Sequence, residues 1–210
     1  MVMIPGAPDP SSMPMADPDR PWRRSCRSVS AEGTFRIGKA VGHALAVRFG
    51  PSAVSAAGRE RDLAAGACLA LVGELGGGKT VFTKGLAAGA GVDPLCRVTS
   101  PTFVIRQDYP GSLPVHHYDV YRLSGAQDLL ALGFEEDLAQ GVLVVVEWAD
   151  RVIAAIPPEA LVVEFEHAAD PSGLTGTSGR DGGCRRLTFC AAPWPWADIL
   201  DPILVPFQSC

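Results

Sequence analysis

The residues with the clearest chemical potential in this chain are a run of glycines followed by a lysine and a threonine. Residues 73–80 read GELGGGKT and fit the pattern G-x-x-x-x-G-K-[ST], which surrounds nucleotide phosphates with backbone N–H groups, an ammonium and a hydroxyl. Glycines permit the tight curl of such a loop because they tolerate positive φ and carry no Cβ. The sequence therefore predicts a phosphate-binding loop formed by Gly73, Glu74, Leu75, Gly76, Gly77, Gly78, Lys79 and Thr80.

The last two residues of this loop have separate expected roles. Lys79 is able to reach the β- and γ-phosphates as a flexible point charge, and the Thr80 hydroxyl is placed to bind Mg²⁺. A helix that begins near Thr80 would point its free N–H groups and its positive dipole end at the phosphates. The alternative is a glycine-rich turn with a chance lysine. The flanks disfavour it, because residues 67–72 are typical of a buried strand and residues 81–88 of a helix.

Hydrolysis of a nucleotide also needs a metal ligand and a group that orients the attacking water. Glu147 follows the apolar run 142–146, and ligands of α/β sheets bind beyond the carboxyl ends of the strands. A carboxylate there is able to bind Mg²⁺ directly or through water, whereas a surface glutamate at a strand end is the alternative. Asp119 ends the short strand expected at 115–118. It is expected to hold Mg²⁺ through water or to polarise the attacking water, with a turn residue or helix cap as the alternative.

A polar loop with a proline follows the helix that begins near Thr80. It contains Ser100 and Thr102, and Ser/Thr loops in this place sense the γ-phosphate in several nucleotide hydrolases. An ordinary proline turn is the alternative. Lys79, Asp119 and Glu147 are the candidate catalytic residues, and this loop is a further candidate part of the site.

The elements that must position these residues follow from the spacing of apolar side chains. Helical spacing is found at 33–49 and 125–139, and strands are expected at 67–72, 103–109, 115–118, 142–146, 161–166 and 186–190, the last two as an antiparallel pair. Residues 50–65 are expected to extend or to loop out from the helix at 33–49, and residues 170–183 are expected to be a flexible loop. Because strands alternate with helices, the sequence predicts an α/β sandwich.

Composition limits the class of protein. The chain has 210 residues, 47% of them hydrophobic, which is enough for one substantial core. Its net charge of −5 gives no overall basic field for nucleic acid. It has no apolar run long enough for a membrane span, no secretory signal in its first 30 residues, and six cysteines without a C-x-x-C pair. These features favour a cytoplasmic protein with reduced cysteines and no membrane contact.

Three segments of the chain are predicted from these patterns. Residues 1–30 are rich in proline, serine and methionine and are expected to be a disordered tail. Residues 31–192 hold all the candidate site residues and are expected to form one nucleotide-binding domain. Residues 193–210 place tryptophans among prolines and are expected to be an irregular tail.

Four strings in the chain, in their order and spacing, carry a resemblance to one family. They are GELGGGKT at 73–80, SPTF at 100–103, HYDVYRL at 117–123 and VEW at 146–148. Over roughly residues 30–192 the chain resembles the TsaE (YjeE) family, the bacterial ATPases of tRNA threonylcarbamoyladenosine synthesis. The phosphate loop alone is generic, whereas the other three strings are far more specific. Glu74 departs mildly from the family, in which aspartate is common at this position.

The resemblance implies a P-loop NTPase-like three-layer sandwich with a mixed, mainly parallel central sheet. It implies ATP and Mg²⁺ as cofactors and weak hydrolysis until the protein meets TsaB and TsaD, with tRNA contacted only indirectly through that complex. Matched residue by residue, Lys79 and the loop glycines bind phosphate, and Thr80 and Glu147 bind Mg²⁺. Asp119 corresponds to a second acidic residue needed for activity. Thr34 corresponds to a threonine that opens the first helix near the nucleotide.

Two other classes of function stay open from the sequence. A P-loop small-molecule kinase would need an acceptor pocket and an arginine-bearing lid, and Arg97, Arg106 and Arg122 do not form such a cluster. A nucleotide-gated interaction module would use ATP binding to order the loop near Ser100, with little turnover. A GTPase is disfavoured because guanine is commonly read by an Asn-Lys-x-Asp loop and the chain contains no asparagine.

Overall fold

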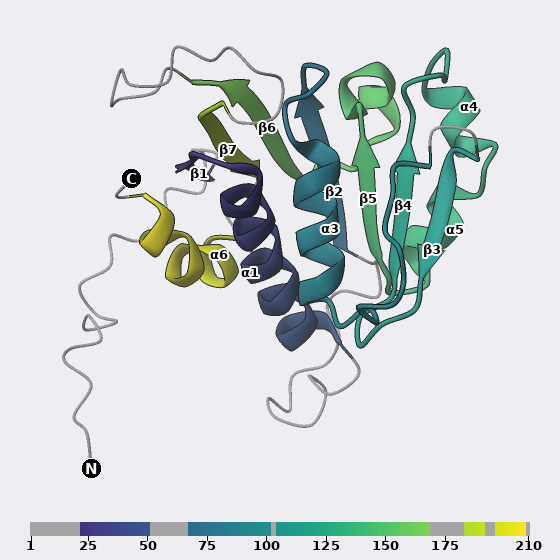
Figure 1. Ribbon diagram of the computed structural model, residues 1–210. Coiled ribbons are helices and arrows are strands. Elements are labelled where there is room, and N and C mark those ends of the chain that lie inside the picture. Colours follow the sequence, from purple (N-terminus) through teal and green to yellow (C-terminus); the bar gives the residue numbers. More distant parts are fainter. Residues whose placement is uncertain (1–21, 51–66, 102–103, 169–182, 192–195, 209–210) are drawn as a thin grey trace.

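A seven-stranded sheet in the order β1-β7-β6-β2-β5-β4-β3 forms the centre of the molecule (Figure 1). The computed structural model describes residues 22–50, 67–101, 104–168, 183–191 and 196–208. The strands are β1 (Trp22–Ser28), β2 (Ala67–Gly73), β3 (Arg106–Tyr109), β4 (Val115–Asp119), β5 (Leu143–Glu147), β6 (Leu161–His167) and β7 (Arg185–Ala191). Strands β6, β2, β5 and β4 run parallel, and the outer strands pair antiparallel. The predicted mixed sheet with a parallel centre is confirmed.

Helices cover both faces of this sheet. They are α1 (Ala31–Phe49), α3 (Lys79–Gly89), α4 (Ala126–Leu130), α5 (Phe134–Ala139) and α6 (Trp196–Leu204), with 3-10 turns η3 (Ala149–Ala155) and η4 (Val205–Phe207). Strand β2 shows why two cores form: Leu69 and Leu71 pack with α1 and α3, whereas Cys68 and Ala70 pack on the opposite face with residues of α4, α5 and η3. The chain is therefore a three-layer α/β sandwich. None of the described helices is long and apolar enough to cross a membrane.

Helices α1 and α3 lie side by side on one face (Figure 1) because glycines line their contact. A Cβ added at Gly42 would lie 2.0 Å from the Leu86 carbonyl oxygen, and one at Gly85 would lie 2.1 Å from the Phe35 carbonyl oxygen. Only residues without a side chain allow the two backbones to approach this closely. The Ser30 hydroxyl caps the start of α1 by accepting from the Gly33 N–H at 3.0 Å. The two helices are thus held close to each other, and the start of α1 is capped.

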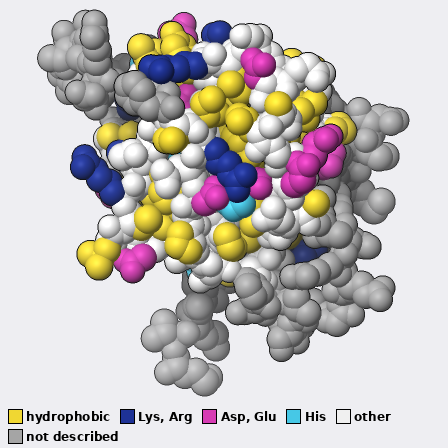
Figure 2. All heavy atoms as spheres, turned by 90° about the vertical axis from the view of Figure 1, so that its right-hand side faces the viewer, with side chains coloured by type: hydrophobic (Ala, Val, Ile, Leu, Met, Phe, Trp, Pro, Cys, Tyr) yellow, Lys and Arg dark blue, Asp and Glu magenta, His cyan; other side chains and the backbone are white. Residues whose placement is uncertain are grey.

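A buried carboxylate ties the β3 edge of the sheet to α5. Asp137 is 1% exposed and accepts from the Tyr118 hydroxyl at 2.6 Å, while Arg106 and His116 lie 3.0 and 2.9 Å from the same oxygen. Burial and the Asp137 carboxylate raise the pKa of Tyr118. Acidic, basic and histidine side chains gather on the face that Figure 2 shows. Charges at an edge strand discourage pairing with another chain, and the cluster has a structural role.

The predictions of an N-terminal and a C-terminal tail were wrong for the residues of these segments that the structure describes. Residues 22–28 form β1, in which Trp22 and Cys26 are buried. The local sequence does not indicate this strand, because WRRSCRS holds few apolar residues and its partner β7 is far away in the sequence. Residues 196–204 form α6, whose Leu200 and Leu204 are completely buried in the α1 core. This helix contains Pro202, which predicted irregular structure.

Other boundaries differ in detail. The helix expected at 125–139 is two short helices, because Gly133 adopts φ +80 between them. The strand expected at 103–109 is shorter, since Ile105 has φ 63 and β3 begins at Arg106. The predicted antiparallel pair β6–β7 is confirmed. The loops expected at 50–65 and 170–183 lie outside the described residues except at their ends, Gly50 and Gly183.

Candidate phosphate and metal site

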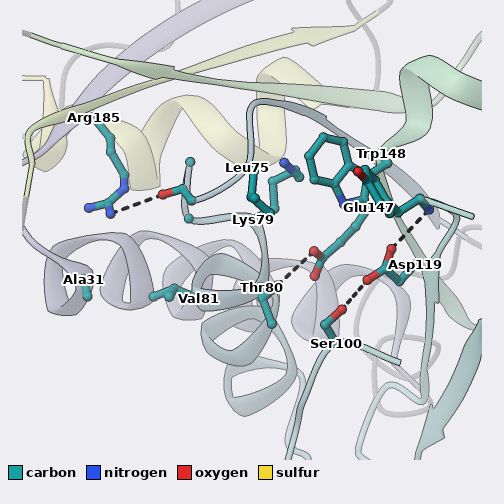
Figure 3. A pocket seen from close by; sticks show the side chains of 14 residues that line it. Ala31, Leu75, Lys79, Thr80, Val81, Ser100, Asp119, Glu147, Trp148 and Arg185 are labelled. Atoms are coloured by element: carbon teal, nitrogen blue, oxygen red, sulfur yellow. Dashed lines mark hydrogen bonds between the residues drawn. The ribbon is translucent and has the colours of Figure 1, made fainter. Parts of the chain in front are cut away.

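The predicted site residues meet in an open cavity of about 670 Å³ at the carboxyl ends of β2, β5 and β4 (Figure 3). The phosphate loop runs through it, with Ser100, Asp119 and Glu147 on one side and Arg185 on the other. This placement follows from the topology, since the carboxyl ends of parallel strands meet at one edge of the sheet. Three predicted ligands, Thr34, Gly73 and Glu74, do not line the cavity and lie next to it or within the loop.

The backbone of the loop has the geometry that its glycines predict at two of the three central positions. Gly76 and Gly78 have φ of +79 and +100, whereas Gly77 does not adopt positive φ. Gly73 also needs to be glycine, because at φ +138 a Cβ would lie 2.4 Å from the Phe165 carbonyl oxygen. Gly78 is the N-cap of α3, and no described side chain caps this helix. Its first N–H groups are therefore free for an anion.

Lys79 occupies the centre of the cavity and is 5% exposed. Its ammonium donates to the carbonyl oxygens of Gly73 at 2.6 Å and Glu74 at 2.9 Å, and lies 3.6 Å from the centre of the Trp148 ring. Burial lowers the pKa of Lys79, and the carboxylate of Glu147 opposes this shift. An ammonium has one more N–H than these two hydrogen bonds use, so Lys79 retains a donor for a phosphate oxygen.

Trp148 reaches this position through an uncommon backbone conformation. Its φ of 64 and ψ of 36 lie in the left-handed region, which bulky residues rarely adopt. The ring packs against Tyr121, with ring centres 4.9 Å apart, and covers the lysine ammonium. Such strained residues cluster at functional sites. The structure places Trp148 in the cavity wall.

Glu147 is 2% exposed and accepts three hydrogen bonds. The donors are Thr80 Oγ1 at 2.9 Å, His117 Nε2 at 2.8 Å and Thr83 Oγ1 at 3.3 Å. His117 is completely buried, and its Nδ1 has no partner within the described part of the chain. The Thr80 hydroxyl and the Glu147 carboxylate, the two predicted metal ligands, are therefore in direct contact. Both offer the hard oxygen atoms that Mg²⁺ prefers.

His117 and Thr83 are partners of Glu147 that sequence reasoning missed. His117 lies two positions before Asp119 on β4, so both side chains point to the same face of the sheet. This alternation was a usable signal, because it also sends His116 to the opposite face, where it meets Asp137. Thr83 lies on α3 one turn beyond Lys79, whose carbonyl oxygen it also contacts at 3.0 Å. Both residues orient the carboxylate from the buried side.

Asp119 lies directly beside Glu147, because the register of β4 and β5 pairs these two residues. Its carboxylate accepts a hydrogen bond from the Ser100 hydroxyl and another from the Tyr121 N–H at 3.2 Å. The predicted Ser100 loop thus joins the second acidic residue, whereas Thr102 lies outside the described residues. No group of three or more His, Cys, Asp or Glu side chains in the described ranges forms a metal site by itself. A Mg²⁺ here would need phosphate and water oxygens to complete its shell.

Arg185, at the start of β7, was not predicted as a site residue. It is 4% exposed and lies against the phosphate loop on the side away from Glu147 (Figure 3). Its Nη1 donates to the Gly183 carbonyl oxygen at 3.0 Å, and its Nη2 lies 3.5 Å from the Gly76 carbonyl oxygen. No local pattern marks an arginine in an antiparallel strand as a neighbour of a loop that is distant in sequence.

Comparison with known proteins decides the family. Residues 34–173 match the family model described as "Threonylcarbamoyl adenosine biosynthesis protein TsaE". The chain belongs to the TsaE family. The match spans the strings at 73–80, 100–103, 117–123 and 146–148 that carried the resemblance, and the cavity is built largely from them.

Individual members of the TsaE family and one crystal structure support this assignment. A protein from Treponema pallidum named "tRNA threonylcarbamoyladenosine biosynthesis protein TsaE" is 34% identical over 145 residues, which cover 69% of this chain and 93% of that protein. One of the same name from Bacillus subtilis is 43% identical over 106 residues, covering 50% and 65%. The crystal structure of Bacillus subtilis YdiB superposes with a TM-score of 0.60 at 27% identity, covering 89% of this chain and 97% of YdiB.

Proposed function

We propose that this protein binds ATP with Mg²⁺ and hydrolyses it in support of tRNA threonylcarbamoyladenosine synthesis. One observation carries the proposal: the hydroxyl of the phosphate-loop residue Thr80 donates to the Glu147 carboxylate at 2.9 Å. A hydroxyl and a carboxylate in this relation, beside a glycine-rich anion site, would be the protein ligands of a nucleotide-bound Mg²⁺. Membership of the TsaE family supports the role in tRNA modification, because its relatives are named for that pathway.

Each side chain of the cavity has a task in this proposal. The N–H groups of the loop and the start of α3 bind the β- and γ-phosphates, and Lys79 adds a positive charge. Thr80 and Glu147 would hold Mg²⁺, which neutralises charge on the phosphates when it is bound. The Trp148 ring and the burial of Lys79 exclude water from this side, which strengthens the electrostatic interactions within the site.

Asp119 and Ser100 supply the remaining chemistry. Their hydrogen bond places a carboxylate and a hydroxyl on the same side of the cavity as Glu147 (Figure 3). We propose that Asp119 orients the attacking water and that Ser100 responds to the γ-phosphate. The position of Asp119 beside Glu147, fixed by the strand register, supports this assignment.

The partners are part of the proposal. By resemblance we propose that TsaB and TsaD stimulate hydrolysis, that tRNA is reached only through them, and that the protein acts in the cytoplasm. Support for the kinase alternative is weak, because Arg97, Arg106 and Arg122 are not among the described residues that line the cavity. We therefore propose water, and not a small-molecule acceptor, as the group that receives the γ-phosphate.

The test is ATP hydrolysis by the full chain, measured as inorganic phosphate with and without Mg²⁺ and with and without TsaB and TsaD. We expect activity that depends on Mg²⁺ and rises with the partners. Lys79→Ala should abolish it, whereas Lys84→Ala, which removes an exposed lysine from the same helix, should not. Normal hydrolysis by Lys79→Ala, or transfer of phosphate to an acceptor molecule, would refute the proposal. Modified-nucleoside analysis of tRNA from depleted cells tests the pathway separately.

A further inference from the structure

Arg185 is a buried cation that has no carboxylate partner among the described residues. It is 4% exposed, and it forms no ion pair with any described residue. Its Nε is fully buried and has no hydrogen-bond partner within the described ranges. A charged group removed from water in this way is costly unless an anion or several acceptors compensate it. The two carbonyl contacts of Arg185 use fewer donors than a guanidinium carries.

The surroundings of Arg185 leave the phosphate loop as its neighbour. A Cβ added at Gly78 would lie 3.1 Å from Arg185 Nε and 3.5 Å from Thr34 Cγ2, so the guanidinium stem packs directly on the loop. The Thr34 hydroxyl is itself satisfied by Ser28 at 2.8 Å. The next residue along β7, Arg186, points to the opposite face and is exposed. Residue 185 is therefore the position of this strand that brings a positive charge to the cavity.

The order of the strands shows which end of a nucleotide Arg185 would meet. Glu147 and Asp119, on β5 and β4, lie on one side of β2, whereas Arg185 is on β7, two strands away on the other side. Figure 3 shows the same separation, with Arg185 reaching the loop from the side opposite Glu147. If the γ-phosphate and Mg²⁺ lie toward Glu147, the remainder of the nucleotide extends toward Arg185.

We propose that Arg185 is a further ligand-binding residue that donates hydrogen bonds to the α- and β-phosphates, the groups that ADP and ATP share. Arginine suits this task because its planar donors match two oxygens of a phosphate at once. The inference rests on the proposed nucleotide-binding function and adds a second cation, which approaches the phosphates from the side opposite Glu147. It gives a use to a buried charge that has no counter-ion among the residues that the structure describes.

A contact that is present before and during hydrolysis changes binding more than turnover. Arg185→Met should therefore raise KM for ATP about 10-fold or more, while kcat with TsaB and TsaD stays within about twofold. The KM for ATP of Arg185→Lys should lie between the values of Arg185→Met and the wild type, because lysine keeps the charge but loses the planar pair of donors.

The deciding experiment is calorimetry of the full-length wild type, Arg185→Met and Arg186→Met with MgADP and with magnesium pyrophosphate. Pyrophosphate has no nucleoside. If Arg185 contacts the phosphates, Arg185→Met should therefore lower the affinity for both ligands by a similar factor of about 10 or more. The matched control Arg186→Met removes an equal charge from the exposed face of the same strand and should bind both ligands like the wild type. The melting temperature of ligand-free Arg185→Met should equal or exceed that of the wild type, since a buried, unpaired charge has been removed.

The contrary outcomes are distinct. If Arg185→Met lowers the affinity for MgADP but not for magnesium pyrophosphate, the residue contacts the nucleoside and the inference is wrong. If both ligands bind normally, or if the ligand-free variant melts several degrees lower, Arg185 supports the loop and the inference is also wrong. If the wild type binds neither ligand, the proposed function itself fails and the inference with it. A wild type that binds, beside an unaffected Arg185→Met, overturns the inference alone.

Discussion

Glu147→Gln changes the central contact of the site with almost no change in size. In the wild type, Oε2 accepts from Thr80 and Oε1 accepts from His117 and Thr83. A glutamine that keeps its oxygen toward His117 must place its NH₂ group toward Thr80. The Thr80 hydroxyl then accepts a hydrogen bond instead of donating one. An amide nitrogen also replaces the carboxylate oxygen beside it, so Mg²⁺ no longer meets two oxygen atoms there. The negative charge is lost as well.

The expected magnitude follows from these contacts. An interaction with a charged group contributes about 1.5–3 kcal/mol, which corresponds to about 10- to 150-fold in affinity. We expect Glu147→Gln to raise the Mg²⁺ concentration needed for half-maximal ATP hydrolysis by at least about 10-fold and to lower the maximal rate. The fold should be retained, because the amide group still has hydrogen-bond partners in Thr80 and His117.

The assay is a Mg²⁺ titration of ATP hydrolysis at fixed ATP, TsaB and TsaD, combined with thermal denaturation of each protein. Glu164→Gln is the matched control, since Glu164 is a half-exposed carboxylate on β6 that pairs with Arg23 outside the cavity. It should show the Mg²⁺ dependence of the wild type. An identical Mg²⁺ dependence for Glu147→Gln would refute the assignment of this residue as a metal ligand.

Three other experiments probe the helix packing, the buried thiols and the tryptophan beside the phosphate loop. Gly42→Ala places a Cβ 2.0 Å from a backbone oxygen of α3, so thermal denaturation should show a loss of about 1–3 kcal/mol in the free energy of unfolding. Burial raises the pKa of Cys26 and of Cys68 from 9.0 to about 12. Peptide mass spectrometry should therefore find both thiols alkylated far more slowly at pH 8 in the folded chain than in urea. Trp148→Phe should remove most of the fluorescence change on MgATP binding, because this indole lies 3.6 Å from the Lys79 ammonium that we propose binds the phosphates.

Each of these experiments has a control or a contrary result. Gly125→Ala places its Cβ in open space at an extended φ of 173 and should leave the melting temperature nearly unchanged. The thiols retain their protons to higher pH in the folded chain, so their contribution to stability is complete below about pH 9 and is lost as pH rises toward 12. Equal alkylation rates in the folded and unfolded chain would contradict their burial. A full fluorescence change in Trp148→Phe would place the responding indole elsewhere.

The parts of the site that sequence could predict are those encoded by local patterns. The phosphate loop is a contiguous string, and Glu147 and Asp119 each end a strand-like run, so the rule for parallel sheets places both at the same edge from the sequence alone. The strand register then sets the two carboxylates side by side. The α/β class follows in the same way, because the central strands are buried on both faces and are therefore largely apolar.

The parts that sequence could not predict depend on pairing between distant segments. Strand β1 has few apolar residues and is a strand because it pairs with β7, and Arg185 enters the cavity only through that same antiparallel arrangement. Helix α6 is held by two leucines buried against α1 in spite of its internal proline. Propensity is outweighed by tertiary contacts in each of these cases.

The most direct test of the central claim is a crystal structure of this chain with Mg²⁺ and a non-hydrolysable ATP analogue. We predict the β- and γ-phosphates against the N–H groups of residues 76–80, and a metal ion bound to Thr80 Oγ1 and to Glu147, directly or through one water. A phosphate loop without phosphate, or a Glu147 carboxylate turned away from the metal, would contradict the account.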